Sequence, residues 1–232
     1  MILLIKLVLA HLIGDFILQP LSWVKAKEKK KLKAWQFYAH LLIHFTLIML
    51  LVWDFAFLLP ALLIMFSHGI LDAIKLHFKK EATERLWFAA DQLLHLFLIC
   101  IIWYFVEKPA LTFSLNQVNL LYLTALVFIT TPASIIIKTL ISQWNPITDK
   151  PRSASLQHAG KYIGILERLM VFTFTVSNHW EAIGFLIAAK SVFRFGDLKE
   201  SRDLKLTEYV LIGTLLSFGL AMGAGLVVSM LD

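Results

Sequence analysis

Histidine and aspartate residues recur in pairs, four positions apart, within the most apolar stretches of this chain. Random placement of the eight histidines and eight aspartates would give about one such intramembrane-type pair. Four are present, and they are His11 with Asp15, His40 with His44, His68 with Asp72, and Asp91 with His95. Residues at i and i+4 share one face of a helix, so each pair could bind one ion or a substrate from one side.

Imidazole and carboxylate groups together suit zinc, iron and manganese, and helical bundles build metal centres from inward-facing ligand pairs. We therefore expect all eight residues to form a divalent transition-metal site, with zinc favoured and iron or manganese as alternatives. Asp15 or Asp91 would be the catalytic base that acts on a metal-activated water. Gln19 and Gln92 lie close enough to these ligands to orient groups bound to the metal.

The elements that carry these pairs belong to a strongly apolar chain of 232 residues. It is 59% hydrophobic and 16% charged, with a mean hydropathy of +0.74. This composition predicts an all-α polytopic membrane protein, because about 20 apolar helical residues cross a bilayer. We expect about eight transmembrane helices, of which the sixth and seventh are short. The predicted spans are residues 2–24, 36–54, 55–76, 87–106, 117–142, 162–178, 181–196 and 206–230.

The pattern divides the chain into two membrane halves. Residues 1–106 are expected to form a four-helix bundle that carries the polar site, with all eight ligand candidates at one depth in the inner half of the bilayer. Residues 107–232 form the second half, which contains a cluster of basic and acidic residues. This second half also contains a long cytoplasmic loop at about 142–160, which is rich in Pro and small polar residues.

Lysine and arginine residues gather in alternate connections, above all between residues 25 and 33. By the positive-inside rule these connections are cytoplasmic, so both termini are expected to be periplasmic. The first apolar segment lacks a cleavage site of the signal-peptide type. The net charge of +6 then favours contact with membrane lipid and anionic inner-leaflet headgroups. Nucleic acid is not an expected partner, since no aromatic residues alternate with the lysines. The oligomeric state does not follow from the sequence.

A second group of charged residues lies toward the cytoplasmic side of the later spans. Its members are Glu167, Arg168, Lys190, Arg194 and Glu208. One interpretation is a structural network of ion pairs. The other is a substrate-binding pocket for a phosphate or carboxylate, in which the arginines supply bidentate donors and Lys190 a point charge.

At these residues the chain resembles a family of uncharacterised bacterial inner-membrane proteins that begin with an HLIGDF-type motif followed by Gln. The resemblance covers residues 11–19, His40 and His44, residues 67–75, residues 91–95, and the later pairs Glu167-Arg168, Lys190-Ser191 and Glu208-Tyr209. It implies a multi-pass protein of the bacterial inner membrane and names no activity. By ligand type alone, the pattern also resembles intramembrane metal-dependent hydrolases such as alkaline ceramidases.

Three functions remain open from the sequence. The first is a metal-dependent hydrolase that acts on a lipid or phosphate-containing substrate at the cytoplasmic side. The second is a transporter or channel that uses the His/Asp layer as an ion or proton site. The third is a di-iron membrane oxidoreductase, which the absence of closely spaced histidine boxes disfavours.

Overall fold

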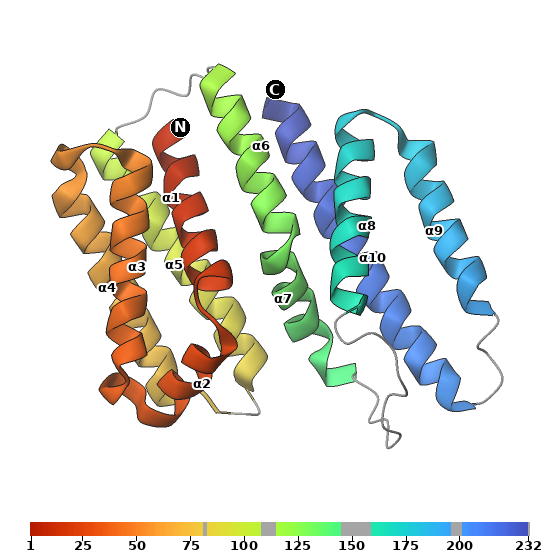
Figure 1. The fold of residues 1–232 in the computed structure, drawn as a ribbon, viewed down its shortest axis with the longest axis horizontal. Helices are drawn as coiled ribbons and strands as arrows, with labels where there is room; N and C mark the ends of the chain where they lie inside the picture. The colour runs from red at the N-terminus through yellow and green to blue at the C-terminus, as the bar shows by residue number, and fades with distance from the viewer. Residues whose placement is uncertain (81–82, 108–114, 145–158, 196–200, 232) are drawn as a thin grey trace. The chain divides into compact units, whose positions relative to one another are not determined.

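The computed structural model describes residues 1–80, 83–107, 115–144, 159–195 and 201–231, and every element in these ranges is helical (Figure 1). The chain divides into two compact units, Met1–Val127 and Phe128–Asp232. The boundary between the units lies about 20 residues after the division that the sequence predicts between residues 106 and 107.

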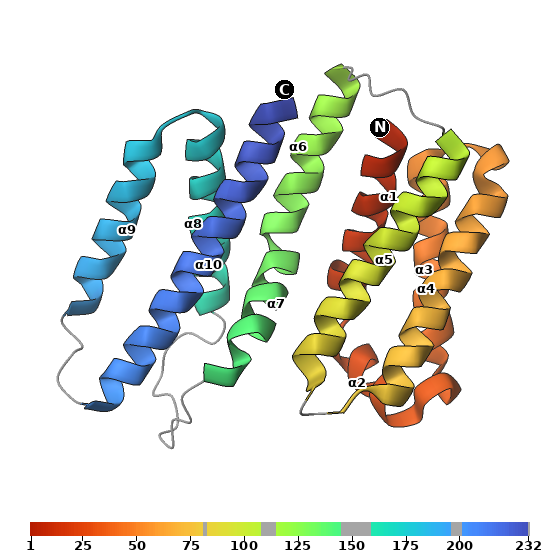
Figure 2. The same cartoon turned by 180° about the vertical axis from the view of Figure 1, so that it is seen from behind.

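The first unit is built on four long helices that pack around the His/Asp residues. They are α1 (Ile2–Leu12), α3 (Trp35–Val52), α4 (Leu58–Phe78) and α5 (Glu84–Glu107). Helix α4 lies against α3 and α5, and α1 packs on α3 and α5, as the view from behind in Figure 2 also shows. A core of buried apolar residues, including Leu7, Ile48, Ile64 and Ile99, joins the four helices on one side of the polar cluster. Helix α6 (Leu115–Ile129) follows.

The predicted first span does not continue as one helix to residue 24. Helix α1 passes into a π-helical turn at Ile13–Ile17, and the chain then bends by 81° into the short helix α2 (Leu21–Lys30). Pro20 explains the break, because it lacks an N–H group and disfavours helical backbone in the residue before it. The lysines that we assigned to a loop therefore lie on α2 and on a 3₁₀ turn, Lys31–Lys33.

The second unit contains α7 (Thr131–Leu140), α8 (Ala159–Val176), α9 (Trp180–Phe195) and α10 (Ser201–Leu231). Helix α10 packs on α8 and α7, and α9 packs on α8. The predicted fifth span, residues 117–142, is broken rather than continuous. Helices α6 and α7 meet at an angle of 43°, because Pro132 in the first turn of α7 cannot continue a helix from the preceding residues.

Among the described residues, four helical stretches are long and apolar enough to cross a membrane: Trp35–Val52, Phe55–Phe78, Glu84–Glu107 and Lys205–Leu231. The number rises to six if each of the two bent pairs is one span. This is compatible with a membrane protein, but the expected eight spans are not confirmed. Helix α9, at the predicted seventh span, has 16 residues and is shorter than the roughly 20 needed to cross. Most of the predicted loop at 142–160 lies outside the described residues.

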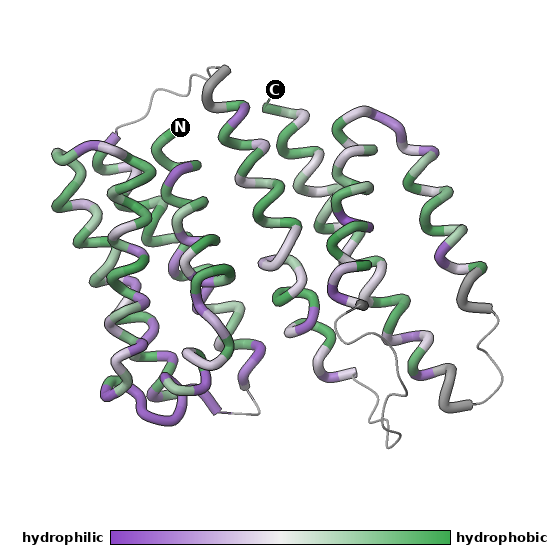
Figure 3. The backbone as a smooth tube through the Cα atoms, in the orientation of Figure 1, coloured by the Kyte–Doolittle hydropathy of each residue, from purple (hydrophilic) through white to green (hydrophobic). Residues whose placement is uncertain are grey.

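Hydropathy is distributed unevenly along the first unit (Figure 3). Hydrophilic residues gather at one end, around α2 and the connections beside it, while the long helices are mainly apolar. The His/Asp pairs interrupt this apolar pattern within the helices.

Candidate metal centre

The eight His and Asp residues singled out in the sequence lie together inside the first unit. Seven of them are buried, and Asp15 is nearly so. They form three overlapping groups in which the potential ligand atoms lie within 4.8 Å of one another. These groups are His11, Asp15, His44 and His68; His40, His68 and Asp72; and Asp15, Asp91 and His95. Four separate helices thus direct their polar faces to one place.

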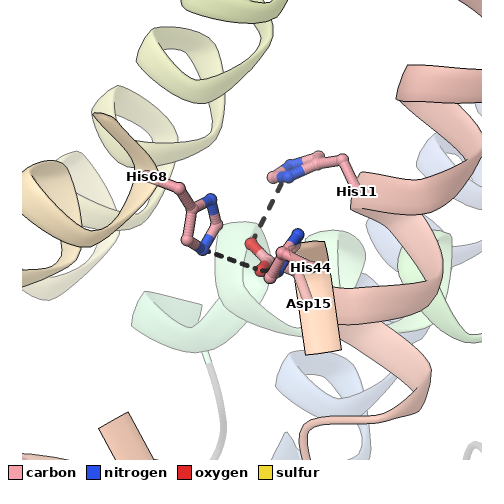
Figure 4. A group of neighbouring side chains, drawn as sticks. All are labelled: His11, Asp15, His44 and His68. Atoms are coloured by element: carbon pink, nitrogen blue, oxygen red, sulfur yellow. Dashed lines mark hydrogen bonds and ion pairs between the residues drawn. The ribbon is translucent and has the colours of Figure 1, made fainter. Parts of the chain in front are cut away.

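Asp15 lies at the centre of this arrangement (Figure 4). Its Oδ1 atom is 3.0 Å from Nε2 of His44, 3.2 Å from Nε2 of His40 and 3.5 Å from Nε2 of His68. Its Oδ2 atom accepts a 2.9 Å hydrogen bond from Nε2 of Gln92 and lies 3.8 Å from Nε2 of His11. One carboxylate oxygen offers about two lone-pair directions, so three imidazoles around Oδ1 exceed what simple hydrogen bonding requires.

The spacing of these atoms fits the first coordination sphere of a metal. Zinc binds imidazole nitrogen and carboxylate oxygen at about 2.0–2.1 Å, which separates tetrahedral ligand atoms by about 3.3 Å. The separations around Asp15 Oδ1 range from 3.0 to 3.5 Å. The Nε2 atoms of His40 and His68 are 3.1 Å apart. The donor set, imidazole with one carboxylate, also suits zinc, iron or manganese.

The two other aspartates are paired with lysines that the sequence interpretation missed. Lys27 Nζ on α2 donates a 2.7 Å hydrogen bond to Asp72 Oδ2, and Lys75 Nζ on α4 donates a 2.6 Å bond to Asp91 Oδ2. Lys27 is buried, although the sequence placed it among the lysines of a solvated loop. Lys75 could have been found, since it lies one helical turn after Asp72. Lys27 could not, because nothing distinguishes it from its basic neighbours.

These pairings leave Asp15 as the aspartate of the cluster whose charge is not balanced by a lysine. Its closest side chains are imidazoles and the neutral amide of Gln92. With neutral imidazoles, three carboxylates and two ammonium groups give the cluster one net negative charge. A buried carboxylate is unfavourable unless a cation or several hydrogen bonds compensate it. A divalent cation beside Asp15 would compensate this charge.

The local backbone around Asp15 allows the histidines to approach closely. A Cβ atom added to Gly14 would lie 2.5 Å from Cε1 and 2.7 Å from Nε2 of His44, closer than real contacts allow. Gly14 and Asp15 both belong to the π-helical turn, and such turns are frequent at functional sites. Glycine is therefore required here for the imidazole of His44 to reach Asp15.

A small cavity of about 10 Å³ adjoins the cluster. Four histidines line it together with apolar side chains such as Leu7 and Ile64; the histidines are His11, His44, His68 and His95. This volume is about that of one water-sized sphere. Among the side chains that the structure describes, Nδ1 of His11 and both ring nitrogens of His95 are buried without a hydrogen-bond partner. The site thus offers unused polar atoms beside room for an ion or a water.

The structure gives Arg168 a different environment from the substrate site that we expected. Its guanidinium is buried in the second unit and donates hydrogen bonds to the carbonyl oxygens of Ile129 and Thr130 and to the hydroxyls of Ser134 and Ser217. The two carbonyls lie at the break between α6 and α7. The guanidinium has little remaining donor capacity for a substrate anion, since four of its contacts are to the chain itself.

Those of the other predicted substrate-binding residues whose side chains the structure describes make no hydrogen bond or ion pair with Arg168. Lys190 Nζ donates a 2.5 Å hydrogen bond to Glu167 Oε2, an ion pair between α9 and α8. Glu208 is exposed on α10. The side chain of Arg194 lies outside the described residues. The arrangement of the described members agrees with the structural ion-pair interpretation more closely than with an anion pocket.

The part of the chain that carries the His/Asp cluster matches a known protein family. Residues 3–124, more than half of the chain, match the family described as "Protein of unknown function (DUF3307)". The chain belongs to this family. The matched region contains all eight residues of the His/Asp cluster, as well as Lys27, Lys75 and Gln92, whereas Arg168 and Lys190 lie outside it. Searches among curated proteins and among solved structures found no match.

Proposed function

We propose that this protein is a membrane-embedded metalloenzyme of the bacterial inner membrane, a hydrolase whose His/Asp cluster binds a divalent transition metal. The observation that supports this most strongly is the environment of Asp15. Its Oδ1 atom faces three imidazole nitrogens at 3.0–3.5 Å, while the other two aspartates have lysine partners. Zinc is the favoured metal, with iron or manganese as alternatives.

In this proposal Asp15, His44 and His68 are the metal ligands, and His40 supports them through its contacts with Asp15 and His68. Catalytic zinc sites keep three protein ligands and an open position. A metal bound here would make a water nucleophilic at neutral pH. Asp15 is then a ligand rather than the catalytic base that the sequence also suggested, and Asp91 is held by Lys75.

His11 is suited to accept the proton of the attacking water. It lines the cavity, and its Nδ1 atom is buried without a hydrogen-bond partner among the described residues. Its Nε2 atom lies 3.2 Å from Oε1 of Gln92, a contact that fixes the orientation of the ring. Gln92 in turn donates to Asp15, so one amide positions both the ligand and the proton acceptor.

The charge of the cluster favours an anionic substrate. One divalent cation changes the net charge from one negative to one positive, which attracts a phosphate or another anion in a medium of low dielectric constant. The basic residues of α2 lie at the hydrophilic end of the first unit and suit anionic lipid headgroups. A lipid or other phosphate-containing molecule reaching the site from the cytoplasmic side is therefore the proposed substrate class. Both termini would be periplasmic in this topology.

Metal content of the purified full-length protein tests the proposal. Protein solubilised in detergent without chelator should retain zinc, iron or manganese in stoichiometric amount through gel filtration. His68→Ala should remove this metal, whereas His77→Ala, which changes an exposed histidine on the same helix, should not. If wild-type protein and both variants contain equally little metal, the metalloenzyme proposal is wrong.

A lipid panel separates hydrolysis from binding alone. Metal-loaded protein in nanodiscs of mixed phospholipids should release a water-soluble or lipid product detectable by mass spectrometry, and Asp15→Asn should not. Product formation that is equal in both proteins would show that the cluster does not catalyse the reaction.

Ion or proton transport through the same cluster is the second candidate. The small size of the cavity favours it, because about 10 Å³ accommodates an ion or a water and not a lipid headgroup. A transporter should exchange its metal within seconds and produce metal or proton flux in proteoliposomes. Tight metal retention without flux would exclude this candidate in favour of an enzyme, and tightly bound iron would instead favour the di-iron oxidoreductase.

A further inference from the structure

One side of the cluster has polar atoms that the first metal does not use. Asp91 and His95 lie on one face of α5, and together with Asp15 they form a separate group of potential ligand atoms within 4.8 Å. Asp91 Oδ2 accepts hydrogen bonds from Lys75 and Gln92. In the ranges that the structure describes, Asp91 Oδ1 and both ring nitrogens of His95 are buried without a partner. Buried polar atoms without a partner are energetically unfavourable, and a ligand bound on this side of the cluster would remove that cost.

This second group directly adjoins the first. The two oxygens of Asp15 face different neighbours: Oδ1 lies near His44 and His68, and Oδ2 lies near His11 and Gln92. A carboxylate in this position can bridge two ions. The imidazole rings of His68 and His95 are stacked with their centroids 3.9 Å apart. A histidine of the first group is thus in direct contact with the histidine of the second, so ions bound by the two groups would be neighbours.

We propose that Asp15, Asp91 and His95 form a second divalent-cation site that shares Asp15 with the first, so that the protein holds a dinuclear centre. This inference rests on the proposed function for the neighbouring ion. The second ion binds more weakly than the first, because the cluster already carries a net positive charge once one divalent cation is present. Two adjacent cations would clamp a phosphate group between them.

Lys75 controls access to the second site in this scheme. Its ammonium group occupies Asp91 Oδ2 at 2.6 Å, and its side chain is about one quarter exposed, so it can turn toward solvent. The lysine and the second cation compete for the same carboxylate. Removing the lysine charge should therefore strengthen binding of the second ion, whereas a purely structural ion pair would predict no gain.

Manganese is the probe for this proposal, because two Mn²⁺ ions that share a carboxylate give an exchange-coupled electron paramagnetic resonance spectrum. Full-length protein in detergent should bind two Mn²⁺ per chain, the second at least about tenfold more weakly than the first. The coupled signal should appear only as the second site fills. His95→Gln should abolish the coupled signal and keep the first ion, and the exposed His77→Gln serves as the matched control.

Lys75→Gln provides an independent test, because it should strengthen binding of the second ion, whereas His95→Gln should weaken it. It should tighten the second Mn²⁺ by about tenfold, since it removes a cation in direct contact with Asp91. Lys79→Gln, which changes the lysine directly after the end of α4 that pairs with glutamates instead, should leave both affinities unchanged.

The second site would be overturned by a single Mn²⁺ per wild-type chain at saturation, by two ions without exchange coupling, or by a second ion that Lys75→Gln binds no more tightly than wild-type protein does. Loss of both ions in His95→Gln would also overturn it, by making His95 a ligand of the first ion. Each of these leaves the proposed metalloenzyme intact, whereas wild-type protein that binds no transition metal would refute the proposed function itself. If His95→Gln is not monodisperse, the wild-type spectrum and Lys75→Gln decide the question.

Discussion

The two units of this protein each bury charged side chains, but they treat them in opposite ways. In the second unit, the guanidinium of Arg168 is surrounded by two backbone carbonyls and two hydroxyls that accept its hydrogen bonds. In the first unit, imidazoles crowd around Asp15 while nitrogens of His11, His40 and His95 remain without partners among the described side chains. A buried polar group that the chain satisfies by itself indicates structure, and one that it leaves unsatisfied indicates a ligand.

Asp15→Asn gives the largest expected effect and tests the first half of this comparison. Structural zinc sites are worth about 10–16 kcal/mol in total, so loss of the one charged member of a three-ligand site should weaken zinc binding at least about 1,000-fold. Competition with a chelator of known affinity measures this. Asp54→Asn is the matched control, because Asp54 is exposed and caps a turn by accepting a hydrogen bond from the backbone of Ala56. Equal zinc affinity of the two variants would contradict the assignment of Asp15.

Arg168→Gln tests the second half. It removes several hydrogen bonds and leaves the carbonyls at the α6–α7 break without their donor, which should lower the free energy of unfolding by about 3 kcal/mol. The amount of metal bound per folded chain should not change. Denaturation followed by tryptophan fluorescence, with metal analysis of the folded fraction, checks both statements. Loss of metal with unchanged stability would instead restore Arg168 as a site residue.

Gly14→Ala tests whether the backbone of the first unit is shaped for the metal site. Alanine normally favours a helix over glycine by about 1 kcal/mol. Here the new Cβ would collide with the ring of His44, so zinc affinity should fall by about 10–100-fold. Gly219→Ala on α10 is the control, since a Cβ there meets no atom within 4 Å. It should leave zinc binding unchanged and stabilise the protein slightly.

Lys79→Ala should have the smallest effect. Burial alone would lower the pKa of Lys79, but hydrogen bonds from its ammonium group to Glu28 and Glu84 outweigh burial and raise the pKa above 10.5. From neutral pH up to about 10.5 the contribution of these ion pairs to stability is therefore complete, and it is lost as pH rises through the raised pKa of Lys79. Because the glutamates are exposed, the substitution should cost less than about 1 kcal/mol, and less again in high salt. A larger loss at neutral pH would show that α2 depends on this pair.

The sequence predicted the cluster because the periodicity of a helix is visible in the positions of residues. The i, i+4 spacing of the four pairs shows which side chains share a helix face. Random placement would give fewer such pairs than the four present, so the pairs stand out from the other His and Asp residues. Gln92 was also identified beforehand as an orienting residue, and it does contact Asp15. The metal itself and the reaction remain predictions.

The sequence did not predict where long helices break or which cations enter the core. The apolar pattern runs across Pro20 and Pro132 and therefore predicts continuous spans there. The helices nevertheless break at both sites, because proline interrupts the hydrogen bonds of a helix. Lys27 was grouped with its basic neighbours because composition cannot tell which lysine turns inward after an 81° bend.

The sequence by itself thus determined the helical, apolar character of the chain and the identity of the eight His and Asp residues that the described structure brings together. Only the tertiary structure decided their roles, because roles depend on distances between helices rather than on spacing within one. It paired Asp72 with Lys27 and Asp91 with Lys75, and it surrounded Asp15 with imidazoles. The charge of a side chain is encoded in the sequence, but the partner that balances this charge is set by packing.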